Sequence, residues 1–437
     1  MQAQMNENWF TAVPENFQAI NANELGPVLK TQPTLWIYTP AVKAFPTFWN
    51  QIKALAAGFD FCPKPTQTVM LAASDRSLIK KELQKAFFQA GLAVQNVTHT
   101  PDTVQLLCLL RQQTPLFWLS INFSGLDSRG ENIALLQQCG VPVLVWCVDN
   151  PFHLLSQHTS ELWQQCVLLV TDKWFVPHLR QLGASAWHLP LATDPNIFTP
   201  APDLPPQEGL LFVGSSSFPG KNKFFAGCTL NPQLEQKARQ MMLTGKRPNL
   251  DWWLKKEGMP RAWFSPDWRQ RGFAAESMSL AWRRHVLTTL SEQETTRIYG
   301  DRDWERLVPA AQARAAVDYY AALPTLYATA EFSLNLTSLQ LPCGLTQRHF
   351  DVWAAGGFLL TDASPGLDLF PDHLVHPISF STPQQAIHKI ATLRAAPALQ
   401  QELRLAWQQE ILGRHTYLHR VQNILEIVGE NVSQKKR

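Results

Sequence analysis

Short apolar runs alternate with amphipathic segments along most of the chain. The runs TVMLAAS (68–74), PLFWLSINFSG (115–125) and VPVLVWCVDNP (141–151) have the length and composition of buried strands. Between them, LIKKELQKAFFQAGL (78–92) and ENIALLQQCG (131–140) carry apolar residues at three- and four-residue spacing, which predicts helices. Strands that alternate with helices in this way predict a parallel sheet covered on both faces, and therefore an α/β fold.

A second series of strands and helices follows a linker rich in proline and acidic residues, LATDPNIFTPAPDLPPQEG (191–209). It opens with LLFVGSSSFPG (210–220), a strand that runs into a turn of small residues. It resumes with the helix AWRRHVLTTL (281–290) and with a strand and turn, TRIYGDRDW (296–304). It ends with two strands and a helix in 331–363 and with two helices at 383–396 and 399–412. Between these parts, residues 222–278 are expected to form a helical insertion rich in Trp and Lys.

The length of 437 residues exceeds what one ordinary core holds and suits two domains. We therefore expect an N-terminal extension with one strand and one helix, two Rossmann-like domains, and C-terminal helices with a polar tail. The boundaries are 1–64 for the extension (strand and helix in 33–57), 65–195 for the first domain, 196–400 for the second domain with its insertion, and 401–437 for the C-terminal part.

The composition is that of an ordinary globular protein. With 45% hydrophobic residues, 17% charged residues and a net charge of +3, the chain offers no broad basic surface for nucleic acid. No apolar run approaches the ~20 residues of a membrane span, and the N-terminus lacks the pattern of a signal peptide. Seven scattered cysteines without a CxxC pair argue against a disulfide framework, so we expect a cytoplasmic protein.

The densest candidate chemistry lies in LNLTSLQLPCGLTQRHFDVWAAGGFLLTD (334–362). Its first strand breaks at Pro342 and Gly344, Thr346 is expected to cap the helix, and a pair of glycines ends it. The helix then begins at the carboxyl end of a strand, where unpaired amides and the helix dipole favour an anion. Because Gly344 allows close approach to the backbone, a diphosphate is the expected ligand.

Arg348 and Asp351 lie three residues apart on this helix and therefore share a face near its start. We expect Arg348 to contact phosphate and Asp351 to accept hydrogen bonds from ribose hydroxyls, with Gln347 beside them. The structural alternative is a surface ion pair of little energetic consequence.

Two further turns are candidates for the same ligand. Gly214, Ser215 and Ser216 follow a strand directly and offer small residues and hydroxyls beside a phosphate. After another strand, Gly300 opens a turn that is expected to hold the edge of a base, with Trp304 available for stacking. A plain structural turn explains either sequence equally well.

In the first domain, WCVDNPFH places Asp149 and His153 at the carboxyl end of a buried strand, where ligands bind in open parallel sheets. Both are candidate catalytic residues, as a general base or as a group that orients a substrate. The segments 122–125 and 75–77 occupy equivalent turns and are candidates for contacts to a second substrate, although turn chemistry alone accounts for them.

As a set, these motifs resemble the CgeB-like (spore maturation protein B) glycosyltransferases of the GT-B fold. The resemblance covers roughly residues 65 to 425 and is strongest from residue 334 onward. Besides 334–362, it is carried by LDLFPD (367–372), HTYLHR (415–420), VWCVDNPFH and LPLATDPNIFTP. It implies two Rossmann-like domains whose parallel sheets face a central cleft, the first on the acceptor side and the second binding a nucleotide sugar.

The resemblance implies transfer of a sugar from a nucleotide-diphosphate donor to an acceptor hydroxyl. The sequence does not identify the acceptor, and a surface glycan, a lipid-linked glycan and a protein such as flagellin all stay open. It assigns Arg348 and Asp351 to the phosphate and ribose of the donor, and Gly300 with its neighbours to the base. Related retaining enzymes carry a carboxylate eight residues before the ribose ligand, where this chain has Cys343.

The chain has no obvious Asp-x-Asp metal motif, so we expect no cofactor and no metal ion. Arg348, helix-terminus amides, and Lys221 or Lys223 would then stabilise the leaving diphosphate. Two rival functions stay open: a sugar-nucleotide epimerase or phosphorylase on the same scaffold, and a binding module that has lost activity.

Overall fold

The structure of the protein is a computed structural model that describes residues 27–28, 48–50, 52–53, 65–75, 77–201, 203–260 and 262–435. The strand and helix expected within 33–57 lie largely outside the described residues, as does most of the extension 1–64.

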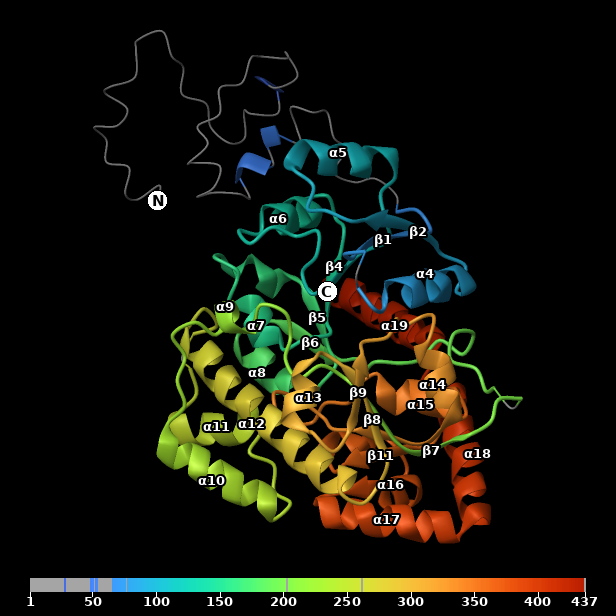
Figure 1. The fold of residues 1–437 in the computed structure, drawn as a ribbon. Helices are drawn as coiled ribbons and strands as arrows, with labels where there is room; N and C mark the ends of the chain where they lie inside the picture. Colours follow the sequence, from blue (N-terminus) through green and yellow to red (C-terminus); the bar gives the residue numbers. More distant parts are fainter. Residues whose placement is uncertain are drawn as a thin grey trace.

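The first lobe is built around a six-stranded parallel sheet (Figure 1). Its strand order is β2-β1-β3-β4-β5-β6, as the alternation of strands and helices predicted. The strands are β1 (Thr68–Ala72), β2 (Ala93–Val97), β3 (Phe117–Ile121), β4 (Val143–Cys147), β5 (Val167–Val170) and β6 (Ser185–His188). The helices are α4 (Lys80–Gln89), α5 (Thr103–Gln112), α6 (Glu131–Gln138), α7 (Pro151–Leu155) and α8 (Phe175–Gln181), with the 3-10 helix η3 (Glu161–Gln165).

The second lobe holds another six-stranded parallel sheet, in the order β12-β11-β10-β7-β8-β9. Its strands are β7 (Gln207–Val213), β8 (Thr296–Gly300), β9 (Gln312–Ala315), β10 (Ala330–Asn335), β11 (Leu359–Asp362) and β12 (Ser379–Phe380). Because the chain order reverses between β7 and β10, the carboxyl ends of these two strands form a topological switch point, the usual ligand position in such sheets.

The helices of the second lobe alternate with its strands except in two runs. The helices of this lobe and the C-terminal part are α9 (Lys221–Phe224), α10 (Pro232–Leu243), α11 (Leu250–Glu257), α12 (Asp267–Ser291), α13 (Asp303–Leu307), α14 (Leu323–Thr329), α15 (Arg348–Ala354), α16 (Asp372–Ile378), α17 (Pro383–Ala395), α18 (Pro397–Arg414) and α19 (Tyr417–Lys435), with the 3-10 helix η4 (Pro365–Leu369). The two runs are α9 to α12 after β7 and α17 to α19 after β12.

The central strands are mostly apolar and buried, as expected where helices cover both faces of a sheet. Every residue of β1 is buried, and successive side chains point to opposite faces. Met70 therefore joins a core with Trp118, whereas Val69 and Leu71 join a separate core with Trp146. The first of these cores continues into the second lobe, so the two lobes share buried apolar surface.

Helix α12 connects the lobes. It runs for 25 residues from Asp267, whereas the sequence pattern predicted a helix only from residue 281 and assigned the preceding part to the insertion. The earlier half, DWRQRGFAAESMS, mixes polar and small residues and shows no clear apolar stripe. Trp268 in this half nevertheless stacks on Phe152 of α7, with ring centroids 3.6 Å apart.

The C-terminal helix α19 returns to the first lobe and lies beside α4 (Figure 1). Its Tyr417, Val421 and Ile424 are buried in the core of that lobe. The polar tail expected at the C-terminus is wrong in part, because α19 extends through Lys435. Arg420 donates to the carbonyl of Leu191 at 3.0 Å, which ties this helix to the interlobe linker.

Candidate active site between the lobes

A pocket of about 380 Å³ lies where the two lobes meet. The loop after β4 and helix α7 line it from the first lobe, while α9 and the loop after β10 line it from the second. Its lining residues are Val148, Asp149, Asn150, His153, Leu154, Phe218, Phe224, Phe225, Ser338, Gln340 and Leu341. The structure thus brings Asp149 and His153 together at the carboxyl end of a strand, where the sequence placed them.

Asp149 lies at the edge of this pocket and is oriented by Asn122. The amide Nδ2 of Asn122 donates to the Asp149 carboxylate at 2.7 Å, and its Oδ1 accepts from the Val148 amide at 2.9 Å. Asn122 has a φ of 52°, in the left-handed region that non-glycine residues rarely adopt. Residues held in such a conformation are often found at functional sites. Burial by the surrounding protein raises the pKa of Asp149, and the hydrogen bond from Asn122 opposes that rise.

His153 is joined to the second lobe through Gln340. Its Nε2 lies 2.7 Å from Gln340 Oε1, and Gln340 Nε2 donates to Glu276 at 3.2 Å. Since the Gln340 amide nitrogen faces a carboxylate, its oxygen faces the imidazole, and Nε2 of His153 must carry the proton. Burial lowers the pKa of His153 to about 4, so the ring is neutral and Nδ1, which has no partner among the described residues, is an unprotonated acceptor.

Glu276 also gathers two cations near the turn after β7. Arg283 lies 3.5 Å and Lys221 3.8 Å from its carboxylate, and Arg283 Nη1 donates to the carbonyl of Ser215 at 2.8 Å. Burial, and after it the neighbouring charge of Arg348, lowers the pKa of Arg283, whereas Glu276 opposes the shift. An anion at this turn would relieve the repulsion between the two guanidinium groups.

Arg348 spans the switch point of the second sheet. Its Nε and Nη2 donate to the carbonyl of Val213 at 3.0 and 2.6 Å, and its Nη1 donates to Asn335 Oδ1 at 2.8 Å. These bonds join the ends of β7 and β10. A guanidinium has five N–H groups, and these three bonds together with a hydrogen bond to Tyr327 leave half-buried Arg348 one donor for a ligand.

The turn after β7 is packed against the turn after β8. Ser216 donates from its amide and hydroxyl to Asp301 at 2.6 and 2.9 Å, and a Cβ at Gly300 would overlap the carbonyl of Gly214. Trp304 is fully buried and donates its indole N–H to Gly214 at 2.8 Å. The expectation that Trp304 stacks on a base is therefore wrong: both Gly300 and Trp304 support the turn from beneath.

Asp351 lies inside the protein, with 1% of its surface exposed. One oxygen accepts from Thr193 at 2.8 Å and from Gln347 at 3.2 Å, and the other accepts from Tyr319 at 2.7 Å. Burial raises its pKa to about 8, against the effect of these hydrogen bonds. Its oxygens are thus occupied by protein donors, which is at odds with a ribose-binding role, and Arg348 and Asp351 form no common surface.

The loop that precedes α15 is held by both lobes. The Cys343 amide donates to Asp172 of the first lobe at 2.9 Å, and burial raises the pKa of the Cys343 thiol to about 11. Thr346 donates to Asn335 at 2.7 Å and does not cap α15, whose N-cap is Gln347 without a side-chain cap bond. Gly344 lies in the same loop, with no room for a Cβ beside Leu341.

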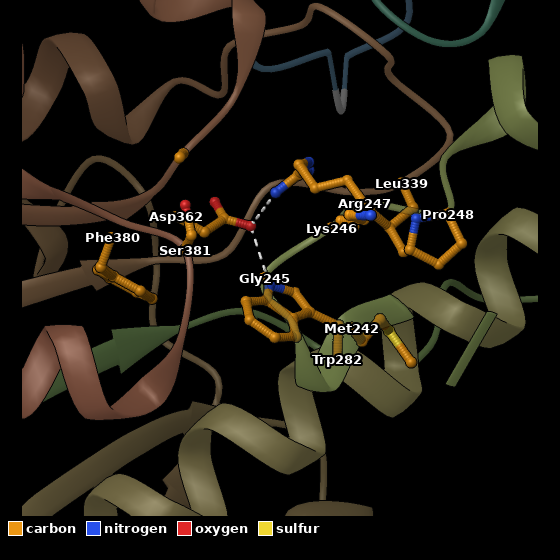
Figure 2. Close-up of a pocket in the computed structure, with 11 residues that line it drawn as sticks. Met242, Gly245, Lys246, Arg247, Pro248, Trp282, Leu339, Asp362, Phe380 and Ser381 are labelled. Atoms are coloured by element: carbon orange, nitrogen blue, oxygen red, sulfur yellow. Dashed lines mark hydrogen bonds and ion pairs between the residues drawn. The ribbon is translucent and has the colours of Figure 1, made fainter. Parts of the chain in front are cut away.

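Asp362, at the end of β11, supports this loop from behind (Figure 2). It accepts from Trp282 at 3.0 Å and from the Thr337 amide at 2.8 Å, and it pairs with Arg247. The cavity beside it holds only about 10 Å³, too little for a substrate. This cluster is therefore structural.

Sequence reasoning missed Arg283, Glu276 and Gln340. The double arginine in AWRRHV was visible, but the sequence does not tell which of Arg283 and Arg284 turns inward.

Among the described residues, no three His, Cys, Asp or Glu side chains lie close enough to hold a metal ion. None of the described helices combines the length and apolar character that crossing a bilayer requires.

Comparison with known proteins bears on the second lobe first. Residues 281–426 match the family model for glycosyl transferase-like domains. The match begins just before Arg283 and includes Arg348 and the loop before α15. No curated protein sequence matches the chain.

Several solved structures are similar to this chain over most of its length. A glycosyltransferase from Rickettsia africae is similar over 83% of this chain and 98% of its own, with a TM-score of 0.50 and 9% identity. An Anabaena protein, HepE, solved with UDP-glucose, covers 83% of this chain and 99% of its own at a TM-score of 0.49 and 11% identity. T4 phage β-glucosyltransferase covers 83% and 98%, at 0.45 and 9%. With its two facing parallel sheets, the chain has the GT-B fold.

Proposed function

We propose that this protein is a glycosyltransferase that moves a sugar from a nucleotide-diphosphate donor to an acceptor hydroxyl. The observation that carries the proposal is the placement of Arg283 and Arg348, both within the glycosyl transferase-like region, around the switch point of the second sheet. Across the interlobe pocket stands a carboxylate, Asp149. One side thus suits a diphosphate and the other suits an acceptor.

The diphosphate of the donor would lie at the turn of Gly214, Ser215 and Ser216. Remaining N–H groups of Arg348 and Arg283 would donate to its oxygens, and Lys221 would add a third positive charge. These fixed charges stabilise the negative charge that develops on the leaving group. We propose that they serve in place of a metal ion and that the enzyme needs no cofactor.

Asp149 is the better-placed general base. It is exposed at the pocket and already ordered by Asn122, whereas His153 commits Nε2 to Gln340 and buries Nδ1. We assign His153 the role of a positioning residue that joins the two lobes beside the acceptor.

We further propose that the chain is a CgeB-like member of the glycosyltransferases, as the motifs in 334–362 and 415–420 suggest. Cytoplasmic action agrees with the free thiols of the described cysteines, which form no disulfide there. A surface glycan or a protein such as flagellin remains the proposed acceptor class.

The experiment that tests the proposal is calorimetric titration with UDP, GDP and dTDP, then with the matching sugar nucleotides. We expect one of them to bind, and Arg283→Ala to weaken binding by about 10- to 100-fold, as loss of a charge-assisted hydrogen bond predicts. Arg284→Ala is the matched control, because Arg284 is the exposed neighbour on the same helix and does not contact the turn.

Circular dichroism would confirm that both variants fold. Equal binding by the two variants would remove Arg283 from the donor site. Failure of the native protein to bind any nucleotide would favour a module without transferase activity. Conversion of the donor without an acceptor would instead indicate an epimerase.

A further inference from the structure

Three phenylalanines of the second lobe close one side of the interlobe pocket. Phe218, Phe224 and Phe225, here called the aromatic wall, pack edge to face, with Phe224 and Phe225 centroids 4.8 Å apart. Phe225 is buried and rests on Phe273 at 5.6 Å, which fixes the wall to α12. Phe218, by contrast, leaves 39% of its surface exposed, and Phe224 is only half-buried.

The rest of the lining mixes polar and apolar residues. Asp149 and Asn150 come from the first lobe, Ser338 and Gln340 come from the loop after β10, and Val148, Leu154 and Leu341 add apolar surface. His153 also lines the pocket, with its ring 5.1 Å from Phe224 and edge to face with it. Apolar rings that remain open beside a carboxylate gain free energy when a ligand with one apolar and one polar side covers them.

We propose that the aromatic wall is the acceptor subsite and that the acceptor presents a pyranose ring, a proposal that rests on the proposed function. A pyranose carries C–H groups on its face and hydroxyls at its edge. Stacked on Phe218 and Phe224, it would direct a hydroxyl toward Asp149. The pocket volume of about 380 Å³ lies in the range of small-ligand sites. A glycan acceptor fits this division better than a serine or threonine side chain.

The transfer step forms one bond, breaks one bond and moves one proton. The acceptor oxygen forms a bond to the anomeric carbon of the donor as the bond from that carbon to the phosphate oxygen breaks. The electron pair of the broken bond stays on the leaving diphosphate, and the acceptor proton passes to Asp149. The aromatic wall takes no part in bond making, so its loss should affect acceptor binding and leave donor binding intact.

Saturation-transfer NMR on the full chain tests the subsite directly. The probes are the methyl pyranosides of glucose, galactose and mannose, with an acetylated serine amide as the alternative acceptor class. We expect saturation to pass from the protein to the ring C–H protons of at least one pyranoside. We expect Phe218→Ala and Phe224→Ala to weaken its binding about tenfold, the usual scale of one aromatic contact. Phe88→Ala, at a 79% exposed position on α4, is the control that should change nothing.

Nucleotide binding by the same samples separates the two proposals. If the native protein binds a nucleotide but no pyranoside, or if only the serine amide receives saturation, the subsite proposal is overturned and the transferase proposal stands. If the two wall variants bind the pyranoside as well as Phe88→Ala does, the ring lies elsewhere and the proposal also fails. If the native protein binds no nucleotide at all, the proposed function itself is refuted.

Discussion

At the scale of single residues, the glutamine at 340 decides which nitrogen of His153 carries a proton. Its amide nitrogen is held by Glu276, so its oxygen is the group left to face the imidazole. We therefore expect ¹⁵N NMR to find a neutral ring at pH 7, protonated at Nε2, with a pKa of about 4 because the ring is buried. Gln340→Glu should raise that pKa, since a carboxylate stabilises the imidazolium.

The His153 resonances can be assigned from their loss in His153→Gln. A ring protonated at Nδ1, or one that titrates near its ordinary pKa of ~6.5, would contradict the arrangement. Either result would mean that His153 Nε2 does not donate a hydrogen bond to Gln340 across the two lobes.

Single residues also mark the boundary of sequence reasoning. The position of Asp149 and His153 after β4 could be predicted because the carboxyl ends of parallel strands always meet at one edge of a sheet, whereas their catalytic role stays a prediction. Trp304 and Asp351 were misplaced because a short helix buries whichever face its tertiary neighbours cover, and those neighbours are remote in sequence. Tyr319 and Thr193, which occupy the oxygens of Asp351, lie 32 and 158 residues away along the chain.

At the scale of elements, α12 shows how one helix joins the two lobes. Gly272 lies in its interior, where glycine normally costs ~1 kcal/mol relative to alanine. Here a Cβ would overlap the imidazole of His153. The missing side chain is what lets the first lobe approach the helix.

We expect Gly272→Ala to destabilise the protein by about 1–3 kcal/mol, as overpacking does, although helix propensity alone predicts the opposite. Urea unfolding measures the change in free energy. The control is Gly413→Ala in α18, where no atom lies within 4 Å of the added Cβ, and where we expect a neutral or slightly stabilising effect. Similar effects of the two changes would mean that His153 does not pack against α12.

The alternation of elements was readable from the sequence, whereas the long elements that cross between lobes were not. Strands such as β3 and β4 are short and almost entirely apolar, so the pattern identifies them directly. The first half of α12 and all of α19 bury residues against a lobe that is distant in sequence. The first half of α12 shows no clear apolar stripe. In α19, Tyr417, Val421, Ile424 and Val428 do recur at helical spacing, but this pattern does not tell which lobe covers them.

At the scale of the whole molecule, the linker and α19 connect the lobes twice, and buried titratable groups gather near these connections. Burial raises the pKa of Asp351 to about 8 and that of Glu82 to about 7. Tyr320 of the second lobe donates to Leu78 of the first lobe at 2.5 Å and lies 3.1 Å from Glu82. Ionisation of Asp351 or Glu82 would therefore affect the contacts between the two lobes.

Burial acts on the histidines in the opposite direction. It lowers the pKa of His153, His158 and His349 to about 4, and that of His415 to about 3. Their stabilising contribution is complete above an unfolded pKa of ~6.5 and is lost as the pH falls toward 4. Above pH ~6.5 these histidines no longer change the stability, and the carboxyl groups dominate.

We therefore expect the stability of the protein to decline between pH 6.5 and 8.5. A buried carboxyl with a raised pKa contributes stability below its unfolded value of ~4, and this is lost as the pH rises through the folded value. Over this interval the Asp351 carboxyl alone accounts for up to roughly 2 kcal/mol, at 1.36 kcal/mol per pH unit and proton.

Asp351→Asn, which stays uncharged, should flatten the decline of the melting temperature. Asp303→Asn, at an exposed carboxyl of α13, should leave it unchanged. Identical pH profiles for Asp351→Asn and the native protein would mean that Asp351 is ionised throughout, held by its three donors rather than neutralised by burial.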